Sequence, residues 1–179
     1  MTTSDFIRKF RRYTRLALCF CLWINAHNAH AVGATCAVSS TGMAFGAYQP
    51  LTFAGELTSV DITSTANVRV VCTGLLALGG YTISLGPSMY GTGNRISTRF
   101  LNNTTNGGAY MGYNIFTEST YTTIWGDGTA GSLVNGTSPL TPGTSTSNHT
   151  VYGKVPAGQN ILKAGSFSDS LTMTLTYTP

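Results

Sequence analysis

The sequence predicts an all-β fold built as a sandwich, and three observations support this prediction. Short segments with apolar side chains at every second position recur along the chain, as in Tyr81–Leu85. Turn sequences rich in Gly, Asn and Asp separate these segments. No segment after residue 31 shows the period of an amphipathic helix. Many short strands joined by glycine-rich turns are typical of a β-sandwich.

Residues 1–31 predict an export signal rather than a part of the fold. A basic segment that ends at Arg15 precedes the apolar stretch Leu16–Ile24, and Ala29-His30-Ala31 offers the small residues of a cleavage site. The apolar stretch is too short to cross a bilayer as a helix. We therefore expect an exported protein whose single domain is 32–179, with no membrane span once the signal is removed.

The positive charge of the whole chain belongs to this signal. Five of the ten Lys and Arg residues and one of the six Asp and Glu residues lie in residues 1–31. The mature segment keeps five of each, so its net charge is near zero. Such a balance gives no electrostatic reason to expect nucleic acid or an anionic membrane as a partner.

The expected strands follow from apolar alternation and from the turns between them. Gly42 separates the first two, and Gly79-Gly80 precedes the most regular alternation, Tyr81–Leu85. Residues 131–148 are rich in Ser, Thr, Gly and Pro and predict a surface loop, or a mobile loop that contacts other surfaces. In order, the expected strands are Ala34–Val38, Met43–Tyr48, Leu57–Thr63, Val68–Thr73, Tyr81–Leu85, Arg99–Leu101, Tyr110–Thr117, Thr122–Trp125, Val151–Val155 and Ser168–Thr178.

The C-terminal segment alternates apolar and hydroxyl side chains. Leu171, Met173, Leu175 and Tyr177 share one face, and threonines fill the other. The printed sequence offers no later strand to cover the open side of this one. We therefore expect another polypeptide to supply that cover.

The mature segment holds two cysteines, Cys36 and Cys72. In an exported protein such a pair favours one disulfide, with two buried free thiols as the alternative. In the chain-entropy model, this crosslink would stabilise the fold by roughly 3–4 kcal/mol. His149 is the only histidine after residue 31, so no metal site is expected.

The sequence gives little support for catalysis. The mature acids are scattered, Asp127 between two glycines is typical of a turn, and His149 has no identifiable nucleophilic partner. A carboxylate pair for glycoside hydrolysis is neither marked nor excluded. Tyr48, Tyr90 and Trp125 could form a sugar-binding platform, but core packing is the preferred interpretation. We expect no enzyme activity and no cofactor.

An ordered run of short motifs resembles the spore coat protein U domain family. Each motif is unspecific alone, but together they follow the family's order from Thr35 to Tyr177. The motifs are Cys36–Ser39 with Phe45–Tyr48, Val68–Thr73, Tyr81–Leu85, Tyr113–Thr117, Ile124–Gly128, Val151–Gln159 and Ala164–Thr174.

The resemblance implies a fold and a set of partners. The family includes subunits of archaic chaperone–usher pili, which are incomplete immunoglobulin-like sandwiches that lack their last strand. Donor-strand complementation completes such a sandwich, first by a periplasmic chaperone and then by a neighbouring pilin subunit at the outer-membrane usher. Leu171, Met173, Leu175 and Tyr177 would line one wall of the donor-strand groove, and the strand at Ala34–Val38 would border the other side. The disulfide Cys36–Cys72 would hold the first strand to a core strand.

One departure from the family concerns the segment before the first cysteine. Rod-forming members carry a donor extension there, whereas cleavage after Ala31 leaves only 32–35 ahead of Cys36. Four residues span roughly 13 Å, too little to fill a groove along a whole strand. This favours a subunit at a fibre end, although tip adhesins of this family typically carry two domains, so the position stays open.

The sequence therefore predicts a surface pilus subunit that serves adhesion or biofilm formation. It would pass through the periplasm to the cell surface. Two other classes remain: a structural protein of a spore or cell coat, and a self-sufficient secreted carbohydrate-binding sandwich.

Overall fold

The computed structural model describes residues 35–48, 60–74, 80–137, 143–159 and 163–177, which belong to the compact unit Gly33–Pro179. The predicted signal at 1–31 lies outside the described residues, as do Ala34, 57–59 and Thr178 of three expected strands and 138–142 of the expected loop. The strands are β1 Thr35–Ser40, β2 Ile62–Gly74, β3 Tyr81–Leu85, β4 Arg99–Asn103, β5 Tyr110–Phe116, β6 Val134–Gly136, β7 Gly143–Val155, β8 Phe167–Ser168 and β9 Met173–Tyr177.

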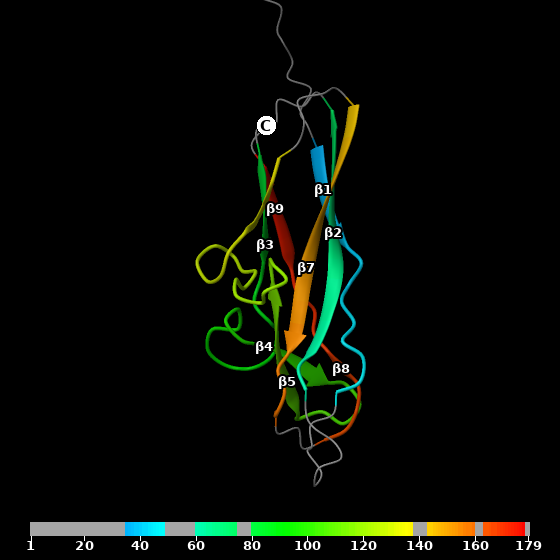
Figure 1. Ribbon diagram of the computed structural model, residues 1–179, viewed down its shortest axis with the longest axis vertical. Coiled ribbons are helices and arrows are strands. Elements are labelled where there is room, and N and C mark those ends of the chain that lie inside the picture. The colour runs from blue at the N-terminus through cyan, green and yellow to red at the C-terminus, as the bar shows by residue number, and fades with distance from the viewer. Residues whose placement is uncertain (1–34, 49–59, 75–79, 138–142, 160–162, 178–179) are drawn as a thin grey trace, which may run out of the picture. The chain divides into compact units, whose positions relative to one another are not determined.

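The strands form two antiparallel sheets (Figure 1). One has the order β1-β2-β7-β5-β4-β8 and the other the order β6-β3-β9. If β1, β2, β3, β5, β7 and β9 are taken as strands A to F of an immunoglobulin sandwich, the sheets contain the neighbours A-B-E-D and C-F. Strand G of that fold would lie on the side of β9 away from β3, where no described strand lies. The predicted all-β, immunoglobulin-like fold is therefore confirmed, and among the described residues there is no helix, hence none that could span a membrane.

The core lies between the two sheets. Inward side chains of β2 and β7 are buried in the core; Val68, for example, is 0% exposed and Val70 is 1% exposed. They alternate with side chains that are more exposed. Trp125, which is 2% exposed, donates its indole N–H to the Ile83 carbonyl at 2.9 Å. Trp125 thus belongs to the core, which rules out its use as a sugar platform.

Arg99 is a fully buried cation within this core. Its guanidinium donates to backbone carbonyls of Leu85, Gly86, Ile96 and Trp125, and to the Asn114 side-chain oxygen, at 2.7–3.5 Å. Burial lowers the pKa of Arg99 from its ordinary value, because a desolvated charge is disfavoured. Arg99 therefore ties β4 to the end of β3 and to the Trp125 turn.

Three predictions about local structure are wrong. The segment 143–148 within the expected loop forms the first half of β7, where it pairs with β2, and Val134–Gly136 forms β6. Met43–Tyr48 forms no strand and lies across the inner face of the large sheet, with Met43 and Phe45 packed over Gly153. Thr122–Trp125 contains only isolated bridges, at Ile124 and Trp125.

Candidate functional site

The two edge strands β1 and β9 each have one described partner. β9 pairs with β3 alone and β1 with β2 alone, although each belongs to a different sheet. Cα atoms of β1 and β9 come within 8 Å of one another, so the two unpaired edges lie on the same side of the sandwich. This side is where the missing immunoglobulin strand would lie.

The backbone of β9 points its unused polar groups toward this side. Gly86 N–H donates to the Thr172 carbonyl at 2.9 Å, in the same register as the β3–β9 ladder. Hydrogen-bonded and non-hydrogen-bonded pairs alternate along an antiparallel ladder. Met173, Leu175 and Tyr177 are therefore non-hydrogen-bonded positions, whose N–H and C=O groups point away from β3.

The same reasoning holds for β1. Thr41 N–H donates to the Asn67 carbonyl at 3.1 Å, in register with the β1–β2 ladder. Cys36 and Val38 are therefore non-hydrogen-bonded positions, with backbone groups that point away from β2. The 4.1 Å between the Cα atoms of Cys36 and Cys72 fits such a pair. Both edges thus offer alternate N–H and C=O groups to a further strand.

Side-chain burial is incomplete along the same edges. The inward residues of β9 and the preceding Leu171 are half-buried, and the threonines between them are exposed. Cys36 and Val38 on β1 are also only partly buried, although they pack against the core. The apolar residues at this side of the sandwich are therefore left partly in contact with solvent.

A cavity of about 1120 Å³ opens between two chain segments, 40–48 and 163–173. Its inner wall is mostly apolar and includes Ala66, Leu85, Leu101, Met111, Ile115 and Trp125. Toward β1 and β9 the space is narrower than two strand spacings, about 9.5 Å, because Cα atoms there come within 8 Å. We call the whole space between 36–48 and 163–177 the groove; it is hollow at one end and narrow at the other.

Packing on Gly153 holds the segment 41–48 against the inner face of the large sheet. A Cβ atom at Gly153 would lie 2.0 Å from the Met43 sulfur and 2.8 Å from the Phe45 ring, so only glycine fits beneath these side chains. The Phe45 ring also packs edge-on against Tyr113, with ring centroids 5.8 Å apart. Ser64 Oγ donates to the Ala44 carbonyl at 2.7 Å.

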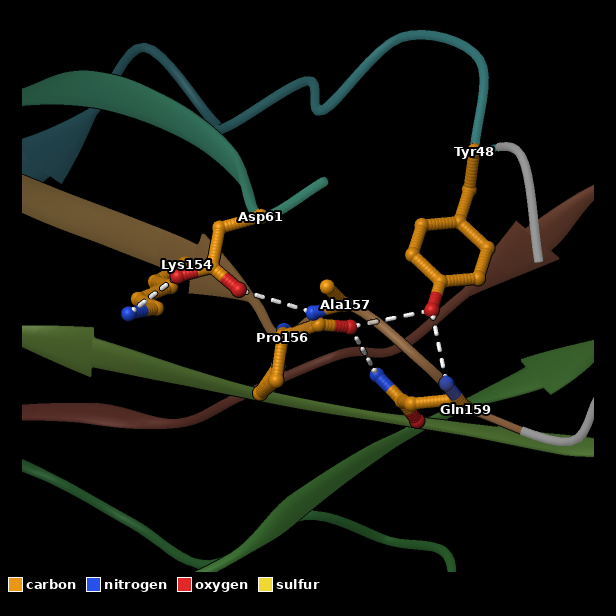
Figure 2. A network of polar contacts seen from close by, with 6 residues as sticks. All are labelled: Tyr48, Asp61, Lys154, Pro156, Ala157 and Gln159. Carbon is orange, nitrogen blue, oxygen red and sulfur yellow. Dashed lines mark hydrogen bonds and ion pairs between the residues drawn. The ribbon is translucent and has the colours of Figure 1, made fainter. Parts of the chain in front are cut away.

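The end of this segment is fixed by the polar network in Figure 2. Tyr48 donates its hydroxyl to the Pro156 carbonyl and accepts from Gln159 N–H, both at 3.0 Å. Beside it, Asp61 accepts from Ala157 N–H at 2.8 Å and forms an ion pair with Lys154. The Lys154 ammonium and the Ala157 N–H lower the pKa of the Asp61 carboxyl. The turn after β7 thus anchors the border of the groove.

Among the described residues, one carboxylate lines the cavity of the groove. Asp169 lines the cavity and accepts from the Tyr113 hydroxyl at 2.8 Å. Burial and the neighbouring carboxylate raise the pKa of Tyr113 well above its ordinary value, so this hydroxyl stays a donor at neutral pH.

The residues considered for catalysis have structural contacts instead. Asp127 accepts from the N–H groups of Thr129 and Ala130 at 2.9 and 2.8 Å, which confirms the predicted turn. His149 lies on β7 rather than in a loop, 2.7 Å from the Tyr81 hydroxyl, and burial lowers its pKa. Within the ranges that the structure describes, no group of three potential metal ligands occurs.

The four predicted groove residues separate along the groove. Leu171 and Met173 line the cavity, whereas Leu175 and Tyr177 lie further along β9 toward the narrow end. The predicted disulfide Cys36–Cys72 is confirmed and joins β1 to β2.

The Spore Coat Protein U domain model matches residues 23–174, most of the chain. The chain belongs to the spore coat protein U domain family. A search of curated proteins finds no match.

Several solved structures share weak similarity with this family member. The CsuC-CsuE chaperone-tip adhesion subunit complex from the archaic chaperone–usher Csu pili of Acinetobacter baumannii matches with 19% identity, a TM-score of 0.46 and coverage of 80% of this chain and 40% of that chain. The present chain therefore spans about two fifths of that chain's length. A chaperone–tip adhesin complex of CFA/I fimbriae biogenesis matches with 12% identity and a TM-score of 0.38, covering 76% and 43% of the two chains. The P pilus rod subunit PapA matches with 15% identity and a TM-score of 0.42, covering 80% and 99%.

Two motifs of the resemblance to the spore coat protein U domain family meet at the groove. The first, Phe45–Tyr48, crosses the sheet over Gly153 and ends in the polar network. The second, Val151–Gln159, supplies Gly153 and the turn that holds Tyr48. The contact between these two motifs is not visible in the sequence, because they are about 110 residues apart.

Sequence reasoning missed the cavity borders at 40–42 and 163–169 and the role of Asp169. One signal for Asp169 was present in the sequence: the alternation with hydroxyl residues extends from Tyr177 back through Ser170 and Ser168 to Phe167. The burial of these residues in the structure follows the same alternation. Asp169 falls on the half-buried phase of that alternation, where a carboxylate is unusual.

Proposed function

We propose that this family member is an exported structural subunit of a surface pilus assembled by the chaperone–usher route, and that it serves adhesion or biofilm formation. Its groove would accept a strand from a periplasmic chaperone and later from a neighbouring subunit at the outer-membrane usher. Residues 1–31 would direct export and be removed. The proposal gives the chain a structural role and assigns it no catalytic step.

The observation that carries this proposal is the pair of facing unpaired edges. β1 and β9 offer alternate backbone N–H and C=O groups, and partly buried apolar side chains line the space between them. A strand added there would form hydrogen bonds with one or both edges and place every second side chain in the core. Leu171, Met173, Leu175 and Tyr177 would form one wall, with Cys36 and Val38 opposite.

A strand can enter the narrow end of the groove only if β1 and β9 move apart. Because Cα atoms of β1 and β9 lie within 8 Å, a strand between them requires the two edges to separate by at least about 1.5 Å to reach two strand spacings. The disulfide attaches β1 to β2 and would limit how far this edge moves.

The other classes are less well supported. A carbohydrate-binding platform could not use Trp125, which is buried in the core. The Tyr48 hydroxyl is already hydrogen-bonded to the Pro156 carbonyl and to Gln159 N–H. A spore or cell coat subunit would use the same strand addition. Recovery of the chain in sheared surface fibres, rather than in extracted coat, is the outcome expected for a pilus.

Self-complementation tests the proposal. A strand of about ten residues, enough to span the groove, with alternating valine and threonine would be fused after Pro179 through a flexible linker. We expect the fused chain to be monomeric and more stable to urea than the chain alone by several kcal/mol, from burial of about four apolar side chains.

The matched control has the same composition with its phase shifted by one residue, so that threonines face the core. Such a shift turns every apolar residue to solvent and should remove the gain. Equal stability of the lone, in-phase and shifted chains, all monomeric, would contradict the proposal. N-terminal sequencing of the exported chain separately tests cleavage after Ala31.

A further inference from the structure

Asp169 breaks an otherwise apolar row of half-buried side chains at the groove wall. From Phe167 to Tyr177 every second residue is half-buried, and the residues between them are exposed. The row reads Phe167, Asp169, Leu171, Met173, Leu175, Tyr177. Asp169 therefore projects on the same side as the residues that a seated strand would cover, and it lines the cavity.

The carboxylate of Asp169 is hydrogen-bonded, and among the described residues no cation forms an ion pair with it; the buried Arg99 guanidinium attracts it from a longer distance. Oδ2 accepts from the Tyr113 hydroxyl and Oδ1 from Ser170 N–H, each at 2.8 Å. Among the described residues the ion pair found is Lys154–Asp61, on another part of the surface. Lys163 also lines the cavity, but its ammonium donates to the Gly107 carbonyl at 3.2 Å.

A strand that covers the Asp169 carboxylate would make its negative charge energetically costly. Asp169 is now half-buried, and water can still solvate it. A strand seated in the groove would remove much of that water, and burial of an ionised carboxylate costs several kcal/mol where no cation in direct contact compensates its charge. Both donors already present are neutral, and burial of the Tyr113 ring keeps its hydroxyl protonated. A cation on the incoming strand would compensate the charge directly.

We propose that Asp169 selects donor strands that carry Lys or Arg at the groove position facing it. This inference rests on the proposed function. It also predicts a pattern in the donor: four apolar residues at alternate positions, facing Tyr177, Leu175, Met173 and Leu171, and then a basic residue two positions beyond the last. The distance from the first of these positions to the basic residue is about 26 Å, at 3.3 Å per residue.

Synthetic peptides with this pattern test the inference. Each peptide has alternating valine and threonine, and the fifth inward position is Lys in one and Met in its partner; a second pair places that residue at the opposite end. The mature chain, refolded from urea with a labelled peptide, is titrated by fluorescence anisotropy. In one of the two orientations we expect the Lys peptide to bind at least about tenfold more tightly than the Met peptide.

Three variants sharpen the test. Asp169→Asn keeps the shape and removes the charge, although its single oxygen can keep only one of the two acceptor contacts, and the Lys preference should disappear. Glu118→Gln removes a charge outside the cavity lining and should leave the preference unchanged. Tyr113→Phe removes a neutral donor and keeps the carboxylate, so the preference should persist or grow, which protects the test if Asp169→Asn folds poorly.

The outcomes separate the two proposals. Equal binding of Lys and Met peptides, or a Lys preference that survives Asp169→Asn, overturns the role of Asp169 while strand acceptance stands. If no peptide binds in either phase or orientation, strand acceptance fails, and the selection by Asp169 fails with it.

Discussion

β3 and β9 are adjacent strands with the same sequence pattern and different burial. Both alternate apolar and hydroxyl residues, and they pair directly, with Ile83 opposite Leu175 and Leu85 opposite Met173. Yet Ile83 is 0% and Leu85 3% exposed, whereas Leu175 and Met173 are only half-buried. β3 lies between β6 and β9, while β9 has a described partner on one side alone. The inward side chains of β9 thus lack the cover that a strand on the second side of β3 gives to Ile83 and Leu85.

The largest effect is expected where Arg99 fixes the end of β3. Arg99→Leu would leave the carbonyls of Leu85, Gly86 and Trp125 without their buried donor, and we expect a loss of about 3–5 kcal/mol in the free energy of unfolding. Urea unfolding of the self-complemented chain measures it. Arg95→Leu is the control, because Arg95 makes a single exposed contact with the Met89 carbonyl and should change stability by less than about 0.5 kcal/mol. Similar losses for both variants would contradict the role given to Arg99.

The second-largest loss of stability is expected from removal of the disulfide, which holds the β1 edge. In the chain-entropy model, replacing Cys36 and Cys72 by alanine removes about 3–4 kcal/mol of stability. Because the crosslink holds one groove border, we also expect weaker binding of a donor peptide, measured by anisotropy. An unchanged peptide affinity would mean that the crosslink stabilises the fold without positioning the groove.

A paired substitution tests the comparison itself. Ile83→Ala should cost about 2–5 kcal/mol with or without a donor strand, since that site is already closed. In the lone chain, Leu175→Ala should lower the free energy of unfolding by about 2 kcal/mol less than Ile83→Ala does. Once a donor strand covers Leu175, the two losses should become similar. The two urea series, each with and without the fused strand, decide this. Equal costs in the lone chain would show that β9 is already covered.

The smallest effect is expected at Asp61, beside the groove border. Its pKa is lowered by Lys154 and by Ala157 N–H, so the folded state favours the ionised form. This contribution is present above the ordinary carboxyl pKa and is lost as the pH falls through the lowered value. The ion pair is largely exposed, so Asp61→Asn should cost less than about 1 kcal/mol at pH 7. The difference between variant and parent should shrink in acid; a constant difference down to pH 2 would contradict the assignment.

The sequence predicted the parts of the fold that have a strong alternation of apolar residues. Tyr81–Leu85 and the row from Leu171 to Tyr177 are examples. It failed for 143–148, because Thr, Ser and Asn on both faces give no period even though this segment pairs with β2 along its whole length. Met43–Tyr48 failed for the opposite reason: its apolar residues alternate because they pack on Gly153, without a partner strand.

The groove was predictable only in part. Leu171 and Met173 could be identified because a wall formed by one strand is encoded in that strand's own period. The opposite border at 40–48 and the segment 163–169 could not, because they meet only through tertiary packing, such as the bonds of Tyr48 to the turn after β7. Asp169 lay in the predicted phase, but the role of a single acid in an apolar row cannot be inferred until its contact with Tyr113 and its place in the cavity are known.

Backbone hydrogen exchange of β3 and β9, with and without a donor strand, tests the central claim most directly. In the lone chain, the amides of Met173, Leu175 and Tyr177 should exchange much faster than those of the inward residues of β3, because they point to the unpaired edge. Addition of the in-phase donor strand should slow them to rates similar to those of β3. Slow exchange of these three amides in a monomeric chain without any donor would contradict the claim that this edge awaits a strand from another polypeptide.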